Sequence, residues 1–285
     1  MTQPSPTLSC EFFPPVDTEA SAALERTCEQ LRALAPAYYS VTYGAGGSTR
    51  NRTFETVFAL HQRAQVPAAP HLTCIASTRD SIRAILRHYQ SHGIDRIVAL
   101  RGDMPSGMHS AGELRHANEL VAFIRETCGD HFHIEVAAYP EIHPQAPSAA
   151  QDLAYFRRKV EAGADAAITQ YFFNADAYGR FLDECRSAGI GIPIVPGIMP
   201  IINFRQLARF SDQCGAEIPR WLRRRLEGFG DDRESLRAFG LEVISELCRK
   251  LLEGGAPGIH FYTMNRAEPT LAICRNLGLL RREAA

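Results

Sequence analysis

Eight short apolar runs alternate with segments of helical periodicity along this chain of 285 residues, and this alternation limits the possible folds severely. The runs have the length of buried strands, and a helical segment follows each of them. Strands that alternate with helices pair in parallel, so eight such units predict a closed (β/α)₈ TIM barrel. The predicted strands lie at 8–13, 38–43, 71–74, 97–100, 133–139, 166–172, 192–198 and 258–263. Helical patterns at 219–227 and 235–253 add extra helices between strands seven and eight.

Length and composition restrict the class of protein further. A barrel of this kind takes about 250 residues, so we expect one domain over 1–285. The formal net charge of -1 gives no indication of nucleic-acid or anionic membrane partners. The N-terminus lacks the pattern of a signal peptide, and no run reaches the roughly 18 apolar residues of a membrane span. The eight cysteines form no C-x-x-C pair, as is typical of buried, reduced thiols, so we expect a cytoplasmic protein without a bound metal.

Polar residues follow the predicted strands at the ends where barrel enzymes place their sites. Taken singly, each has an ordinary explanation, such as a surface ion pair for Arg101 and Asp103 or a satisfied core histidine for His71. Their recurrence at successive strand ends favours a shared site. The residues are Glu11, Thr42, His71, Arg101, Asp103, Tyr139, Glu141, His143, Gln170 and Arg266.

Two carboxylates in this set could divide acid and base roles. Glu11 is flanked by Cys10, Phe12 and Phe13, and an apolar setting raises the pKa of a carboxyl group and suits a general acid. Asp103 is the second carboxylate.

Three other interpretations stay open at this point. His71, Asp103, Glu141 and His143 are metal-competent, which allows a metal-dependent barrel hydrolase, although His-x-His is missing after strand one. The glycines at 44–47 match only part of the dinucleotide fingerprint, so a flexible turn is favoured there. A non-catalytic binding protein on a barrel scaffold is the third possibility.

Several motifs resemble those of the methylenetetrahydrofolate reductase family, in the same order along the chain. They are SCEFFPP at 9–15, SVTYGA at 40–45, PHLTC at 70–74, ALRGD at 99–103, AAYPE at 137–141, ITQ at 168–170 and HFYTMNRAE at 260–268. The resemblance runs from about residue 8 to the last helical segment. The family fold is a (β/α)₈ barrel with non-covalent FAD, in agreement with the strand count.

The resemblance implies a flavin-dependent oxidoreductase of one-carbon metabolism and methionine biosynthesis. NADH or NADPH reduces FAD and leaves, and methylenetetrahydrofolate then takes its place and is reduced to methyltetrahydrofolate in a ping-pong hydride relay. Glu11 matches the general acid that assists opening of the five-membered folate ring. Asp103 matches the carboxylate that tunes the flavin and holds the pterin.

The resemblance also assigns ligand contacts. The FAD positions are Thr42, Tyr43, Ala45, His71, Arg101, Gly102, Asp103, His116, Ala117, Tyr139, His143, Ala146, Asp152, Arg158 and Lys159. The folate positions are Thr42, Asp103, Gln170, Gln206, Phe210 and Arg266. Arg158 and Lys159 are expected to neutralise a pyrophosphate.

Two departures from the family pattern concern cofactor affinity more than reaction type. Arg50-Asn51-Arg52 stands where bacterial members often carry an acid after an arginine, and Tyr155 replaces a polar contact. We expect no regulatory domain of the eukaryotic kind and hence no inhibition by S-adenosylmethionine through one. The expected partners are folate, a nicotinamide dinucleotide and further copies of the chain.

Overall fold

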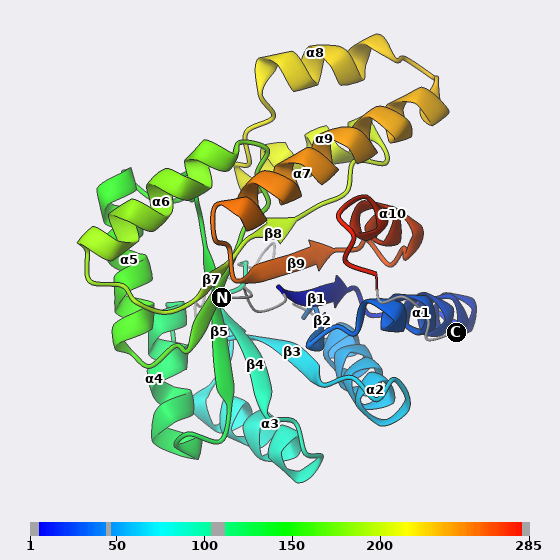
Figure 1. Ribbon diagram of the computed structural model, residues 1–285. Coiled ribbons are helices and arrows are strands. Elements are labelled where there is room, and N and C mark those ends of the chain that lie inside the picture. Colours follow the sequence, from blue (N-terminus) through cyan, green and yellow to red (C-terminus); the bar gives the residue numbers. More distant parts are fainter. Residues whose placement is uncertain (1–5, 44–46, 104–111, 281–285) are drawn as a thin grey trace, which may run out of the picture.

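Parallel strands form a closed ring with helices around it in the computed structural model, which describes residues 6–43, 47–103 and 112–280 (Figure 1). The strand order is β7-β6-β5-β4-β3-β2-β1-β9-β8, and every pairing is parallel. The strands are β1 (Thr7–Phe12), β2 (Tyr38–Val41), β3 (Ala68–Thr73), β4 (Arg96–Leu100), β5 (His133–Ala138), β6 (Ala166–Thr169), β7 (Ile194–Val195), β8 (Gly197–Ile198) and β9 (Gly258–Tyr262). The predicted barrel is confirmed.

The seventh strand of the barrel is interrupted, whereas the sequence predicts one continuous strand over 192–198. Its first half, β7, pairs with β6, and its second half, β8, pairs with β9. Pro196 separates the halves and has no N–H to donate to a ladder. Its carbonyl oxygen still accepts a hydrogen bond of 3.0 Å from the His260 N–H, so the ring closes through this residue.

Helices cover the outside of the ring and follow the predicted order. They are α1 (Thr18–Leu31), the 3₁₀ turn η1 (Arg32–Leu34), α2 (Gly47–Arg63), α3 (Arg79–Ser91), α4 (Ala117–Cys128), α5 (Ala149–Glu161), α6 (Ala175–Ser187), α7 (Phe204–Cys214), α8 (Arg220–Gly228), α9 (Arg233–Glu253) and α10 (Glu268–Asn276). The side chains of Thr78 and Ser148 cap α3 and α5. Helix α4 begins at Ala117, where His116 and Glu119 form a capping box.

Alternation along each strand sorts side chains between two cores. On β1, Cys10 and Phe12 face the helices and belong to the large outer core. Ser9 and Glu11, on the other face, point into the ring. The inner core contains few apolar side chains: Tyr38, Ala69, Val98 and Ile168, with Leu100 and Tyr262 packed against them. The interior of the barrel therefore has room for polar groups.

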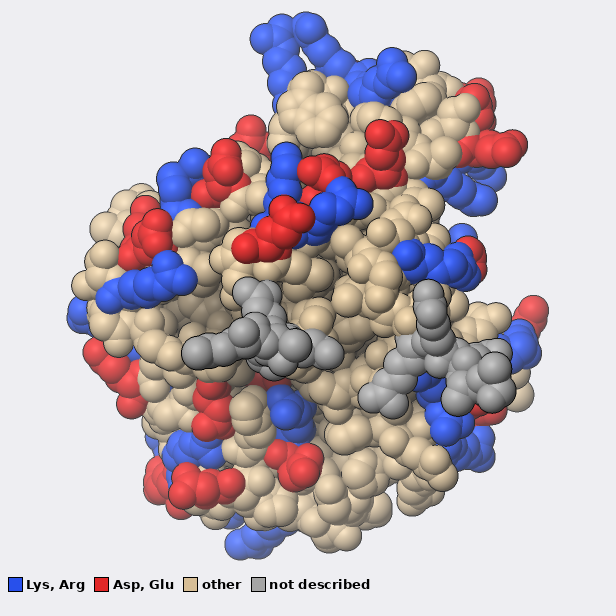
Figure 2. Space-filling model, in the orientation of Figure 1, with Lys and Arg blue, Asp and Glu red and all other residues tan. Residues whose placement is uncertain are grey.

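Helices α7, α8 and α9, which connect β8 to β9, lie together at one side of the ring, with α8 outermost (Figure 1). Acidic and basic side chains are interspersed over most of the face in Figure 2, which agrees with a net charge of -1. Among the described residues, no helix is both long and apolar enough to cross a membrane.

Gly197 lies where β8 approaches β6 most closely, so the barrel should not tolerate a side chain there. A Cβ at this position would lie 2.1 Å from the Thr169 carbonyl oxygen and 2.6 Å from the Tyr262 ring. We expect Gly197→Ala to lower the free energy of unfolding by about 1–3 kcal/mol, measured by urea denaturation. Gly191→Ala is the matched control, since its Cβ would meet nothing within 4 Å. Equal stability of the two variants would contradict this description of barrel closure.

Candidate functional site

A cavity of about 510 Å³ opens at the carboxyl ends of the strands. It brings together residues at or just after the ends of all eight predicted strands, and residues of helix α7, which follows β8. The predicted site residues in its lining are Glu11, Thr42, His71, Asp103, Tyr139, His143, Gln170 and Phe210. We call this space the mouth cavity.

Glu11 sits at the base of the mouth cavity between two histidines. Its Oε2 atom lies 3.3 Å from Nε2 of His71 and 3.6 Å from Nε2 of His260. Neither nitrogen has a partner in hydrogen-bond geometry among the described residues, so these contacts are electrostatic. The carbonyl oxygen of Glu11 accepts a hydrogen bond of 2.6 Å from Thr263 Oγ1, which fixes the end of β1 against the loop after β9.

The expectation of a raised pKa for Glu11 is wrong for the protein without ligands. Burial does raise the pKa, but the attraction of His71 and His260 outweighs burial and lowers the value from 4.5 to about 2. Flanking residues could not reveal this, because both histidines come from distant strands. Glu11 is therefore ionised at neutral pH, and it must receive a proton before it can donate one.

A second cleft of about 580 Å³ adjoins the mouth cavity between the ends of β4 and β5 and the helices that follow them. Both spaces share Asp103, Tyr139 and His143. The predicted residues in its lining are Arg101, Gly102, Asp103, His116, Ala117, Tyr139, His143, Ala146, Asp152, Arg158 and Lys159. Tyr155, noted as a departure, lies here too. We call this space the basic cleft.

The basic cleft contains a half-buried cation. Lys159 Nζ donates a hydrogen bond of 2.5 Å to the Ala137 carbonyl oxygen. Burial lowers the pKa of this lysine to about 8, and Asp152 acts in the opposite direction. Lys159 thus remains charged at neutral pH. With Arg158 and the N-terminus of α4 at Ala117, it forms surroundings that favour a phosphate or diphosphate.

The turn after β4 brings the backbone close to the third strand. Gly102 has φ +81°, and a Cβ there would lie 2.8 Å from Thr73 Cβ, so this position requires glycine. Arg101 donates hydrogen bonds to Gln145 Oε1, at 2.6 Å, and to the Gly102 carbonyl oxygen, at 3.1 Å. The ordinary explanation, an ion pair between Arg101 and Asp103, is absent from the described part of the chain.

A compact loop after β5 shapes the boundary between the two spaces. The Asp152 carboxylate accepts a hydrogen bond of 2.9 Å from the His143 N–H, and the Ala146 N–H donates to the His143 carbonyl oxygen at 2.8 Å. The His143 ring packs edge-on against Tyr139, with centroids 4.5 Å apart. Burial lowers the pKa of His143 and raises that of Tyr139 to about 12, so both rings are neutral near pH 7.

Four of the predicted FAD and folate contacts are not found in either space. Gln206 lies on α7, one turn before Phe210, but does not line the mouth cavity. Arg266 is exposed and lines a separate hollow between α1, α9 and α10. Tyr43 lines neither space. Ala45 lies outside the described residues, as do the glycines at 44 and 46.

Sequence reasoning overlooked two inward residues of β9, although their motif was noted. His260 contacts Glu11, and Tyr262 lines the mouth cavity and donates a hydrogen bond of 2.7 Å to the Thr169 carbonyl oxygen. The signal was available, because residues two apart on a barrel strand face the same side. Cys214 and Met199, which also line the cavity, follow no comparable pattern.

Geometry gives the metal hydrolase no support. Within the described ranges, no three His, Cys, Asp or Glu side chains gather closely enough to hold a metal ion. Glu141 lines neither space, and its carboxylate accepts a hydrogen bond of 2.7 Å from the Glu217 N–H.

Comparison with known proteins gives consistent matches over nearly the whole chain. The family model described as methylenetetrahydrofolate reductase matches residues 1–278. The 5,10-methylenetetrahydrofolate reductases of Salmonella typhimurium and Escherichia coli are each 44% identical over 272 residues, which cover 95% of this chain and 90% of theirs. A solved Clostridium thermocellum protein, whose description says it binds two copies of 5-methyl-5,6,7,8-tetrahydrofolic acid, shares the fold at TM-score 0.68 and 18% identity, covering 97% of this chain and 96% of that one.

The lowered pKa of Glu11 makes a prediction about acid stability. A carboxyl with a folded-state pKa below its unfolded value stabilises the fold above the unfolded value, and this contribution disappears as the pH falls toward the folded value. We expect Glu11→Gln to be less stable than the wild type at pH 7, with the difference shrinking between pH 4.5 and about 2. Thermal melting across this range is the measurement. A constant difference would mean that the two histidines do not hold the carboxylate ionised.

Proposed function

The chain belongs to the methylenetetrahydrofolate reductase family, and we propose that it performs the family reaction in two hydride transfers through one bound FAD. The activity itself, reduction of methylenetetrahydrofolate to methyltetrahydrofolate, follows from the family match. The proposal concerns the cofactor, the nicotinamide donor and the residue roles. Its main support is the position of the Glu11 carboxylate in the mouth cavity, next to a cleft with a half-buried cation.

FAD fits the residues of the basic cleft and its boundary. Lys159, Arg158 and the α4 N-terminus suit the diphosphate, and Gly102 lines the same cleft at the strand end. FAD, when bound, accepts a hydride from NADH or NADPH and returns it to the folate carbon. Asp103 and His143 line both spaces, so they would contact cofactor and substrate at the point where these meet.

Glu11 would act on the folate as the proton donor. Reduction converts the carbon that bridges two folate nitrogens into a methyl group on one of them, so the other nitrogen must gain a proton. A carboxyl group at the base of the cavity can protonate that nitrogen, which breaks its bond to the bridging carbon and leaves an iminium ready for the hydride. The role requires Glu11 to be reprotonated once in every turnover.

Gln170 and Phe210 line the mouth cavity and would orient the substrate. An amide can donate to and accept from a pterin at once, and Phe210 offers an aromatic face for stacking. Thr42 adds a hydroxyl from β2's end. A folate contact from Arg266 would require its side chain to leave the hollow that it now lines.

The visible spectrum of the purified protein tests the cofactor. We expect a yellow protein that bleaches when NADH or NADPH is added anaerobically and regains its colour with methylenetetrahydrofolate. Single-turnover rates with each nicotinamide would identify the preferred donor. A colourless protein that cannot be reconstituted with FAD would refute the proposal.

Glu11→Gln should separate the two half-reactions. Hydride transfer from NADH to FAD needs no proton from Glu11, so its rate should stay close to that of the wild type. The folate half-reaction should slow by about 10²–10⁴-fold, the usual contribution of a general acid. Anaerobic stopped-flow absorbance measures both rates, and an equal loss in both would contradict the assigned role.

Lys159→Met should weaken FAD binding by about tenfold or more, since a charged hydrogen bond to a diphosphate is worth about 1.5–3 kcal/mol. Arg157→Met is the matched control, because Arg157 is exposed and pairs with Glu161 on the same helix. Fluorescence titration of the apoprotein with FAD measures both affinities. Equal affinities would show that the basic cleft does not hold the diphosphate.

A further inference from the structure

A column of polar side chains runs from Glu11 through the inside of the barrel to its opposite end. Its members come from four of the strands, and we call it the interior path. They are Glu11, His260, Ser9, Tyr38, Glu135 and His133. The interior of a barrel is normally filled by branched apolar side chains, so a polar column there requires an explanation.

The upper part of the interior path is fixed by strand register. Ser9 is the direct neighbour of Tyr38 on β2 and of His260 on β9. His260 is fully buried, and its Nδ1 lies 2.7 Å from Ser9 Oγ, while its Nε2 faces Glu11 at 3.6 Å. The Tyr38 and His260 rings stack with centroids 6.0 Å apart.

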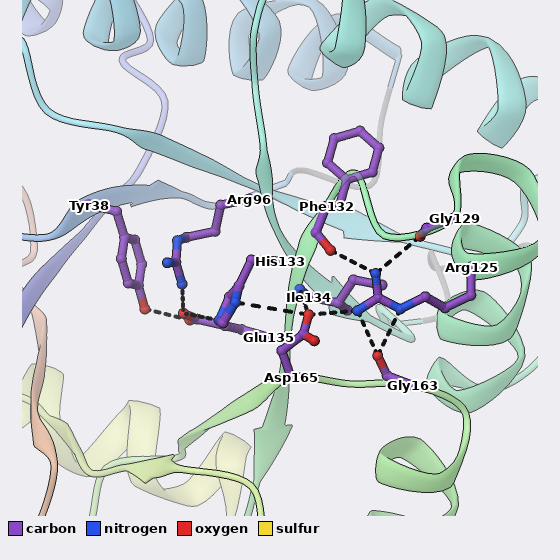
Figure 3. A network of polar contacts seen from close by, with 10 residues as sticks. All are labelled: Tyr38, Arg96, Arg125, Gly129, Phe132, His133, Ile134, Glu135, Gly163 and Asp165. Atoms are coloured by element: carbon purple, nitrogen blue, oxygen red, sulfur yellow. Dashed lines mark hydrogen bonds and ion pairs between the residues drawn. The ribbon is translucent and has the colours of Figure 1, made fainter.

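The lower part of the interior path leads to the amino-terminal ends of β4 and β5. Tyr38 donates a short hydrogen bond to Glu135, whose other oxygen accepts one of 2.5 Å from Arg96 (Figure 3). Nε2 of His133 lies 3.8 Å from the same Glu135 oxygen. The His133 side chain is 39% exposed, whereas that of Glu135 is 4% exposed. The column therefore ends at solvent on the face opposite the mouth cavity.

The proposed role of Glu11 requires a source of protons, and the interior path leads to one. It is ionised in the free protein, and its side chain is only 12% exposed. Substrate and cofactor together would fill the spaces above it. We propose that the interior path carries the proton that reprotonates Glu11. This proton is taken up from water at His133 and passes along Glu135, Tyr38, Ser9 and His260. This inference rests on the proposed function, since only the folate reaction consumes that proton.

The transfer balances without any further reactant. One proton enters at His133 and one leaves from Glu11 to the folate nitrogen, so the path keeps its charge over a turnover. Hydroxyl groups can accept one proton while donating another, and the imidazole does the same through its two nitrogens. Burial makes the pKa of His133 lower than usual, with Arg96 acting in the same direction, so this entry group releases a proton readily.

Tyr38→Phe and Ser9→Ala test the path, because each removes a single hydroxyl and keeps the fold. Tyr39→Phe is the matched control: Tyr39 is the next residue on β2, but it faces outward and donates a hydrogen bond of 2.9 Å to the Cys28 carbonyl oxygen. We expect the folate half-reaction to slow at least about tenfold in the two path variants, with a larger solvent isotope effect in D₂O. Tyr39→Phe should keep the wild-type rate.

The same stopped-flow experiment distinguishes the possible failures. NADH should bleach the flavin at the wild-type rate in all three variants, and failure of the wild-type protein to bleach would refute the proposed function instead. Normal folate rates and isotope effects in both path variants would overturn the interior path. So would lower melting temperatures without any change in rate, since they would show a purely structural role.

Discussion

The parallel pairing of β1 with β9 is the interaction on which the site depends. It joins segments 251 residues apart in the chain and closes the ring. Closure brings Glu11 beside His260 and, across the interior, beside His71. In an open sheet with the same strands, β1 and β9 would be edges, and the carboxylate would face water instead of two imidazoles. The chemistry of Glu11 is thus a consequence of topology as much as of residue type.

The buried polar groups of this barrel fall into two layers with different tasks. Near the mouth, Glu11 is negatively charged in the mouth cavity, and Lys159 is positively charged in the basic cleft. Near the other end, Arg96 compensates Glu135, and a second ion pair between Arg125 and Asp165 lies just outside the ring (Figure 3). A buried charge without a partner would cost several kcal/mol. Each of these charged side chains has polar neighbours, so the barrel can fold with a polar interior.

Much of the fold and part of the site could be predicted from the sequence. The alternation of strands and helices is local, and polar residues at strand ends converge in any parallel barrel, so Asp103, His143 and Gln170 were found. Features that depend on contacts across the ring were not. The pKa of Glu11 depends on His71 and His260. The seventh strand is interrupted at Pro196, with β7 paired to β6 and β8 paired to β9. Arg266 was expected at the site from its place after the last strand and from the resemblance, but its exposed side chain lines a separate hollow, which was not deducible.

Ser9 and His260 are in contact but lie far apart in the sequence, and this separation affects how the chain folds during its synthesis. A ribosome releases β1 early, but the strand that completes its surroundings emerges only after residue 258. During that interval one edge of β1 lacks its partner, and pairings so distant in sequence form slowly. A nascent chain can therefore assemble most of the helices and strands while its reactive centre is still missing. The last strand of the ring completes the surroundings of the Glu11 carboxylate, which makes a finished site a direct indication of a finished fold.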